Sequence, residues 1–184
     1  MPILTQRNVQ AILCELEKRI EGSFGVVNAM RQDSTNFEQW VQIEMCGILN
    51  GYIDNIDNIV IERDGNFDIR ICGNNDDVTK VVIEIKIIQS GNANMPGVIA
   101  DVDNLNAFVP DNPALERAFL AVVYRRQHNE NDSEFYINQI SVYIRSNLLE
   151  NQSQVIEQEG FCLVDNNGEN IEVVLYLNRW GGAR

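Results

Sequence analysis

The sequence predicts a single α/β domain in which a central mixed β-sheet is flanked by helices. Two helical patterns, at residues 8–22 and 37–50, precede three short segments rich in β-branched residues. A third helical pattern at 97–108 leads into another apolar strand, as expected for a helix that crosses over a sheet. The length of 184 residues favours one domain over 1–184, and an apolar fraction of 45% is ordinary for a globular protein.

The two N-terminal helices are predicted from apolar residues that recur at steps of three and four. The first helix runs from Asn8 to about Gly22 and is amphipathic, so one of its faces should be buried. A turn-rich stretch at 32–34 separates it from the second helix, which the Asn-Gly pair at 50–51 ends.

The three β-branched segments cover residues 57–62, 67–72 and 80–88. The linkers at 64–66 and 73–77 carry Asp, Asn and Gly, which favour turns, so antiparallel hairpins are expected. The third segment contains the run VVIEIKII, which lacks the polar alternation of a half-exposed strand. It should therefore be central in its sheet.

The chain after the third strand is expected to return through the helix at 97–108. The next apolar run, 118–124, should lie parallel to the third strand because a helix connects the two. Beyond it, 135–149 favours a helix, and 161–164 with 171–177 favours a terminal hairpin.

Composition excludes several classes of protein. No apolar stretch approaches the length of a membrane span, and the N-terminus lacks the order of a secretory signal, so we expect a cytoplasmic protein without a membrane partner. The four cysteines form no CxxC pair, which favours reduced core residues over zinc ligands or disulfides.

Two charged residues, Glu84 and Lys86, lie inside the apolar third strand. Because strand side chains alternate, both point to the same face of the sheet. Asp68 belongs to the preceding segment, where a hairpin would bring it opposite or diagonal to Glu84. Such charges are costly inside a protein unless they are paired or bind a metal. Two carboxylates can bind Mg²⁺, with Mn²⁺ as a possible substitute. A neighbouring ammonium group can help to orient or activate a water molecule.

A second interpretation of the same residues needs no metal. Glu84 and Lys86 would then be an ordinary charge pair on an edge strand, and Asp68 a residue near a turn. The same face also carries Val82 and Ile88, which a wet edge would expose. We therefore prefer the interpretation in which the charges bind a metal.

Asp68 followed by the Glu-Ile-Lys run at 84–86 resembles the PD-(D/E)xK motif of the restriction-endonuclease-like nuclease superfamily. The expected order of elements over about 36–125, α-β-β-β-α-β, is similar to the core of that family, and both ends of the chain would be additions. One difference is that Phe67, in place of Pro, precedes the aspartate. The resemblance implies a restriction-endonuclease-like core.

The resemblance also implies roles for individual residues. Asp68 and Glu84 would be metal ligands, and Lys86 would position the water and stabilise charge that develops on the phosphate. Many members add a glutamate from the first core helix. We expect Glu44 in that role, because it lies among apolar residues, whereas a helix dipole alone would explain Glu38. The expected catalytic set is therefore Asp68, Glu84, Lys86 and Glu44, with Asp68, Glu84 and Glu44 as metal ligands.

The function expected from the resemblance is a Mg²⁺-dependent nuclease that cuts DNA, in restriction, defence or mobile-element biology. The net charge of −13 opposes this expectation, because phosphate backbones are usually met by Lys and Arg. Either a local basic patch or a basic surface from a homodimer partner or another protein would be needed. The candidates for a local patch are Arg70, Lys80, Arg125 and Arg126.

The alternative function is a nuclease-fold module that no longer cuts and instead acts through a protein partner. The acidic charge favours this alternative, whereas the intact set of Asp68, Glu84 and Lys86 favours catalysis. For the homodimer, the terminal hairpin with the apolar residues 175–177 is the expected interface.

Overall fold

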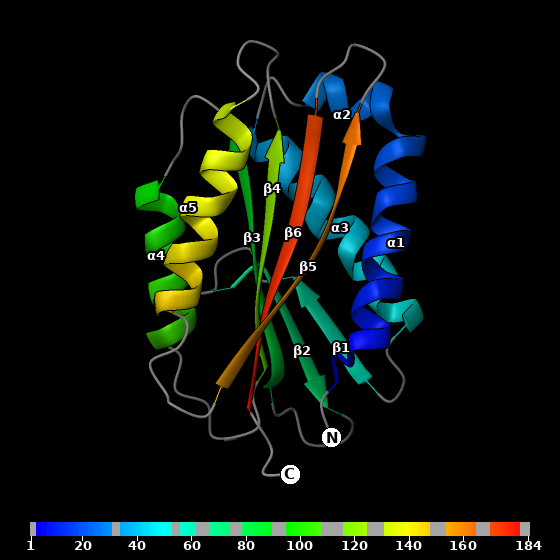
Figure 1. Ribbon diagram of the computed structural model, residues 1–184. Helices are drawn as coiled ribbons and strands as arrows, with labels where there is room; N and C mark the ends of the chain where they lie inside the picture. The colour runs from blue at the N-terminus through cyan, green and yellow to red at the C-terminus, as the bar shows by residue number, and fades with distance from the viewer. Residues whose placement is uncertain are drawn as a thin grey trace.

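The computed structural model is an α/β fold in which helices cover both faces of a mixed β-sheet (Figure 1). The structure describes residues 3–30, 34–52, 56–61, 67–73, 79–89, 95–107, 116–124, 131–147, 154–164 and 170–180. The helices are α1 (Gln6–Gly22), α2 (Phe24–Met30), α3 (Ser34–Tyr52), α4 (Met95–Ala107) and α5 (Asn131–Asn147). The strands are β1 (Ile56–Ile61), β2 (Ile69–Gly73), β3 (Thr79–Gln89), β4 (Glu116–Tyr124), β5 (Gln154–Val164) and β6 (Asn170–Trp180).

Six strands form one sheet in the order β1-β2-β3-β4-β6-β5. Strands β1, β2 and β3 form an antiparallel meander, and β4 lies parallel to β3 along its whole length. Strand β6 pairs antiparallel with β4, and β5 pairs antiparallel with β6. The predictions of a central third strand and of a parallel fourth strand are therefore confirmed.

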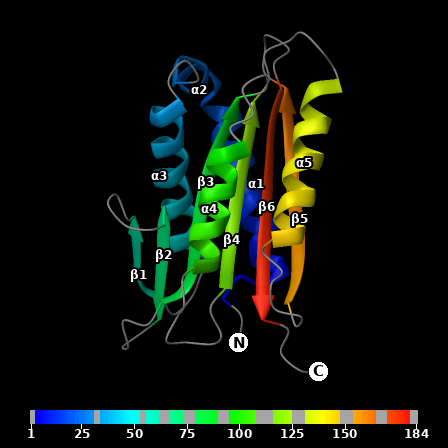
Figure 2. The same cartoon turned by 90° about the vertical axis from the view of Figure 1, so that its left-hand side faces the viewer.

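Alternation along β3 divides the hydrophobic core into two layers. Figures 1 and 2 show α1 and α3 on one face of the sheet and α4 and α5 on the other. The odd-numbered apolar residues of 81–87 join the α1 and α3 layer, while Val82 and Ile88 join the α4 and α5 layer. Glu84 and Lys86 alternate with the odd-numbered set, so they belong to the α4 and α5 face.

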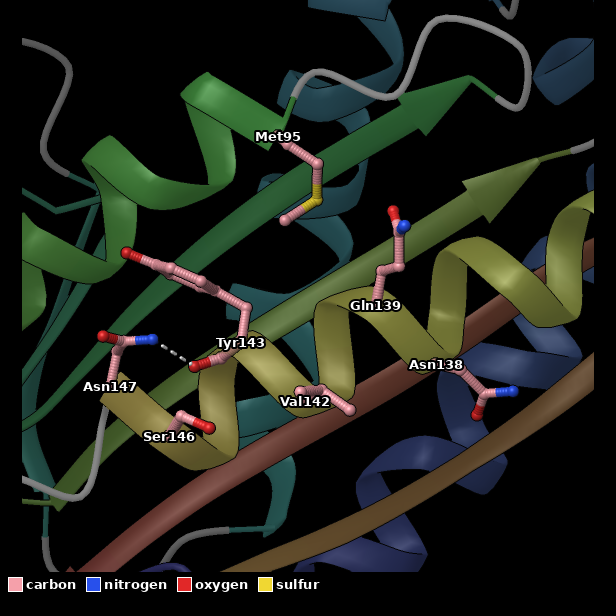
Figure 3. Close-up of a pocket in the computed structure, with 7 residues that line it drawn as sticks. All are labelled: Met95, Asn138, Gln139, Val142, Tyr143, Ser146 and Asn147. Atoms are coloured by element: carbon pink, nitrogen blue, oxygen red, sulfur yellow. Dashed lines mark hydrogen bonds between the residues drawn. The ribbon is translucent and has the colours of Figure 1, made fainter.

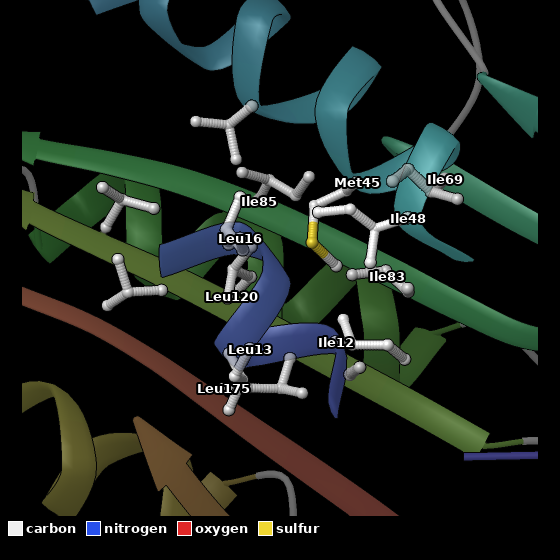
Figure 4. Packing of buried hydrophobic residues seen from close by; sticks show 14 of the residues in the cluster. Ile12, Leu13, Leu16, Met45, Ile48, Ile69, Ile83, Ile85, Leu120 and Leu175 are labelled. Carbon is white, nitrogen blue, oxygen red and sulfur yellow. The ribbon is translucent and has the colours of Figure 1, made fainter. Parts of the chain in front are cut away.

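The layer under α1 and α3 fixes the position of α3 on the sheet. Figure 4 shows how its side chains interlock, with labelled residues Ile12, Leu13, Leu16, Met45, Ile48, Ile69, Ile83, Ile85, Leu120 and Leu175. Full burial of one such side chain contributes about 1.5–3 kcal/mol to stability. Helix α3 is therefore held firmly against β3.

Helix α2 is an element that the sequence analysis does not predict. Its seven residues are too few to show a helical period. The carbonyl of Ser23 accepts hydrogen bonds from the backbone N–H groups of Val26 and Val27, and the Val27 side chain is fully buried. Tertiary packing at the end of α1 therefore makes this helix.

The other predicted helices and strands are present with shifted ends. The largest change is in the terminal hairpin, where β5 and β6 each extend over eleven residues. The turn expected at 64–66 and most of the turn expected at 73–77 lie outside the described residues, as do the residues that connect β5 to β6. No helix in the described part of the chain is long and apolar enough to cross a membrane.

The expected dimer interface in the terminal hairpin is wrong. Leu175, Tyr176 and Leu177 are at most 3% exposed. They lie in β6, which has β4 on one side and β5 on the other, and the Tyr176 hydroxyl lies 2.7 Å from Ser141 Oγ of α5. These side chains belong to the core of one chain, so they have no surface to offer a second copy.

Gly160 of β5 tests the close pairing of the last two strands. A methyl group there would overlap the backbone oxygen of Val173 and lie 3.2 Å from Cα of Val174. Gly160→Ala should therefore destabilise the protein by about 1–3 kcal/mol in urea unfolding. Gly51→Ala is the matched control, because the added group meets nothing within 4 Å and alanine favours a helix. Equal stabilities of the two variants would contradict this pairing.

Candidate metal centre

The candidate site forms beside the first residue of β2, at the point where β3 extends beyond its pairing with that strand. The last register pair joins Ile69 to Ile83, and β3 runs on to Gln89 without a partner in β2. Backbone N–H groups need acceptors wherever water is excluded. Two carboxylates supply them: Asp68 Oδ2 accepts from the N–H of Ile85 at 2.6 Å, and the Glu38 carboxylate accepts from Ile87. The end of a short strand thus places two acids beside β3.

Helix α3 reaches this gap with two side chains one turn apart. Glu38 and Gln42 are four residues apart, so they share a face of the helix. Gln42 Nε2 donates to Asp68 Oδ1 at 2.7 Å. Both carboxylate oxygens of Asp68 are therefore engaged, one by α3 and one by β3.

Asp68 immediately precedes β2, and the neighbouring Ile69 pairs with Ile83, so Asp68 lies beside Glu84 of β3. The prediction that antiparallel pairing brings these carboxylates together is confirmed, since β2 pairs antiparallel with β3 and Asp68 lies close enough to Glu84 to raise its pKa. Glu84 is 6% exposed. Burial, and then the neighbouring charge of Asp68, raises the pKa of Glu84 to about 10. The pair therefore holds a proton at neutral pH.

Lys86 lies one step along the same face of β3. Its Nζ is 2.7 Å from Asp101 Oδ2 of α4, and both side chains are about four-fifths buried, at 20% and 18% exposure. Glu38 and Asp68 also lie within electrostatic reach of Lys86. The Lys86 ammonium group thus pairs with Asp101 and lies within electrostatic reach of three further carboxylates, those of Glu38, Asp68 and Glu84.

The structure does not bring Glu44 to this cluster. Glu44 is two residues beyond Gln42, which turns it by about 200° around α3. Its Oε2 pairs with Arg19 Nη1 of α1 at 2.5 Å. The candidate acid from α3 is therefore Glu38, and burial raises the pKa of its carboxyl group.

Sequence reasoning also missed Gln42 and Asp101. Gln42 could have been found from its spacing to Glu38, four residues along the same helix. Asp101 sits beside the apolar stripe of Val98, Val102 and Leu105, where a charge is unexpected and signals a partner. What the sequence cannot supply is the identity of that partner, because it depends on how α4 lies on β3.

The basic residues expected to contact phosphate are only partly described. Arg70 pairs with Val82 across β2 and β3, so it lies on the same face as Glu84. Lys80 falls at the irregularity where Cys72 pairs with Thr79. Arg125 and Arg126 lie outside the described residues.

The donor chemistry of the cluster fits a hard divalent cation, which prefers carboxylate oxygens. Asp68 and Glu84 meet as a pair, with Glu38 and Asp101 close enough to shift their pKa values or that of Lys86. Within the described residues, no group of three or more His, Cys, Asp or Glu side chains converges on one point. Holding an ion with three protein ligands would therefore require side-chain rotation, starting from the Asp68–Glu84 pair.

A separate groove of about 600 Å³ lies on the outer side of α4 and α5 (Figure 3). Its lining carries amide, hydroxyl and apolar groups and no charged side chain: Met95, Asn138, Gln139, Val142, Tyr143, Ser146 and Asn147. None of the carboxylates of the candidate site lines this groove. It therefore contributes nothing to binding a cation.

Glu84→Gln should make the fold more stable in buffer without divalent cations. A carboxyl whose pKa rises on folding, here from 4.5 to about 10, stabilises the fold fully below the lower value and loses that contribution as the pH rises through this window. The variant should match the wild type near pH 4.5 and gain roughly 3–6 °C in Tm at about pH 8. Scanning calorimetry measures this difference, with exposed Glu21→Gln as the control. A less stable Glu84→Gln protein at about pH 8 would contradict the assignment.

Comparison with known protein families and with curated proteins finds no match to this chain. Its function is therefore inferred from the geometry of the site.

Proposed function

We propose that this chain is a metal-dependent nuclease that hydrolyses phosphodiester bonds, with DNA as its substrate. The observation that carries the proposal is the Asp68–Glu84 pair, in which burial and the neighbouring Asp68 carboxylate raise the pKa of Glu84 to about 10. Such a pair is costly for the free protein, and a divalent cation that replaces the proton would relieve that cost.

The proposed ligands are Asp68 and Glu84, with Glu38 in place of Glu44 as the acid from α3. Mg²⁺, or Mn²⁺ in its place, would supply a Lewis acid for the phosphoryl oxygens and a bound water of lowered pKa. Lys86 carries the positive charge that would orient the attacking water and stabilise charge developing on the phosphate. Gln42 holds the Asp68 carboxylate in one orientation.

The order of elements supports the same proposal. From α3 to β4 the chain runs α-β-β-β-α-β, with β4 parallel to β3. This is the order expected of the restriction-endonuclease-like core. Asp68 immediately precedes β2, and Glu84 and Lys86 lie along β3, which supports the resemblance to the motif. We therefore propose that the fold belongs to the PD-(D/E)xK class.

DNA binding requires positive surface that the net charge of −13 does not supply by itself. Arg70, on the face that carries Glu84, is the described residue best placed to contact a phosphate. A second copy of the chain or a protein partner would supply further positive surface.

A second candidate function is a nuclease-fold module that binds a partner protein without cutting. The observation that favours it is the Lys86–Asp101 ion pair, because an ammonium held by a carboxylate is less available to a phosphate. The two functions differ in one outcome: the module would not cut nucleic acid at any concentration of Mg²⁺ or Mn²⁺.

The wild-type protein should cut plasmid or single-stranded DNA when Mg²⁺ or Mn²⁺ is present and stop when a chelator is added. Asp68→Asn, Glu84→Gln and Lys86→Met should each lower the rate by at least about 100-fold, because each removes a group that acts on the reacting phosphate or its ion. Glu21→Gln, on exposed α1 surface, should cut at the wild-type rate. Metal-dependent cutting that persists in Glu84→Ala would overturn the site.

Glu38→Gln and Glu44→Gln form a matched pair, since both change one glutamate of α3 in the same way. Glu38→Gln should weaken Mn²⁺ binding by roughly 10-fold or more in calorimetric titration, whereas Glu44→Gln should leave it unchanged. Glu44→Gln should instead lower stability by up to about 1 kcal/mol, because it breaks a partly exposed pair with Arg19. The reverse order of the two affinities would restore Glu44 as the ligand.

A further inference from the structure

Asp101 stands out because it is an acid on the packed side of α4. The helix buries Val98, Val102 and Leu105 against the sheet, and Asp101 lies between the first two of them. The other acid of this helix, Asp103, is exposed. A half-turn of helix thus separates an aspartate that faces the site from one that faces water.

The contact that Asp101 makes is with the motif lysine. Its Oδ2 lies 2.7 Å from Lys86 Nζ, and 18% exposure of its side chain keeps water from weakening the attraction. This ion pair joins the middle of α4 to β3. Asp101 therefore determines which way the Lys86 side chain extends.

Lys86 has other carboxylates within reach. Glu38 and Asp68 both interact electrostatically with its ammonium group, and Glu84 lies two residues away on the same face. A lysine side chain has a flexible four-carbon stem, so without Asp101 it would turn toward these acids. There it would occupy the oxygens that a cation needs.

We propose that Asp101 is a positioning residue that draws the Lys86 ammonium toward α4 and so keeps it off the Asp68–Glu84 pair. This role rests on the proposed function, because it matters only if that pair binds a cation. Asp101 would leave the carboxylate pair open to the ion and hold the ammonium beside it, on the side where a phosphate would lie. It acts through Lys86 and is not itself a ligand.

Two simpler roles for Asp101 make different predictions. If Asp101 were a metal ligand, its loss would weaken cation binding whether or not Lys86 is present. If the pair were merely structural, its loss would lower stability, by about 1 kcal/mol for a partly exposed pair, and leave cation affinity unchanged. A double-mutant cycle on Asp101 and Lys86 separates all three roles.

The test measures Mn²⁺ affinity by calorimetry and Mg²⁺-dependent cutting of plasmid DNA for Asp101→Asn, Lys86→Met and the double variant. Asp101→Asn alone should weaken Mn²⁺ binding and slow cutting by roughly 10–100-fold, and Asp101→Glu should restore most of both. In the Lys86→Met background, Asp101→Asn should have no further effect on Mn²⁺ affinity. Asp103→Asn is the matched control on the same helix and should behave as the wild type.

Loss of Mn²⁺ affinity on Asp101→Asn in both backgrounds would overturn the proposal in favour of a metal ligand. An unchanged affinity with lower thermal stability would overturn it in favour of a structural ion pair. The proposed function can fail separately. If the wild-type protein binds Mn²⁺ but never cuts DNA, the proposed nuclease activity is contradicted, while the Mn²⁺ affinities of the double-mutant cycle still decide the role of Asp101. If the wild-type protein binds no Mn²⁺, both the proposed function and the proposed role of Asp101 are contradicted.

Discussion

The site depends on one constraint, which is that the carboxyl group of Glu84 is buried beside that of Asp68. Neither a strand interior nor a neighbouring acid favours an ionised carboxylate, and together they raise the pKa of Glu84 to about 10. The protein tolerates this arrangement because the rest of the fold fixes it in place. Strand β3 pairs with β4 along this stretch, and the Glu84 side chain is only 6% exposed, so its carboxyl group stays in the interior.

The shape of the sheet explains why the other groups gather there. Strand β2 begins at Ile69, one residue after Asp68, so the part of β3 beyond Ile83 has backbone N–H groups with no neighbouring strand on the β2 side. Asp68 and Glu38 accept hydrogen bonds from two of them, so each acid is positioned by the backbone and not by a flexible contact. Helix α4 covers the face of the sheet that carries Glu84 and Lys86, and its Asp101 pairs with Lys86. A short strand beside a long one thus creates a notch that α3 and α4 both reach.

Much of the fold around the site could be predicted from the sequence, because the pattern of residues in β3 is distinctive. Its apolar run and its two charges gave the central strand, the face that Glu84 and Lys86 share, and the approach of Asp68 through a hairpin. The choice between Glu38 and Glu44 could not be made in the same way. Both lie on α3, and the choice depends on how that helix is rotated against β3, which packing of residues such as Met45 and Ile48 decides. The contact of Asp101 with Lys86 and the burial of residues 175–177 also depend on tertiary packing, so the sequence alone could not predict them.

The central claim is that a cation replaces the proton held by Asp68 and Glu84. Calorimetric titration of Mg²⁺ or Mn²⁺ at pH about 7, repeated in buffers with different heats of ionisation, measures that exchange directly. Binding should release about one proton per ion in the wild type and none in Glu84→Gln. Cation binding without proton release, or no binding at all, would contradict the claim.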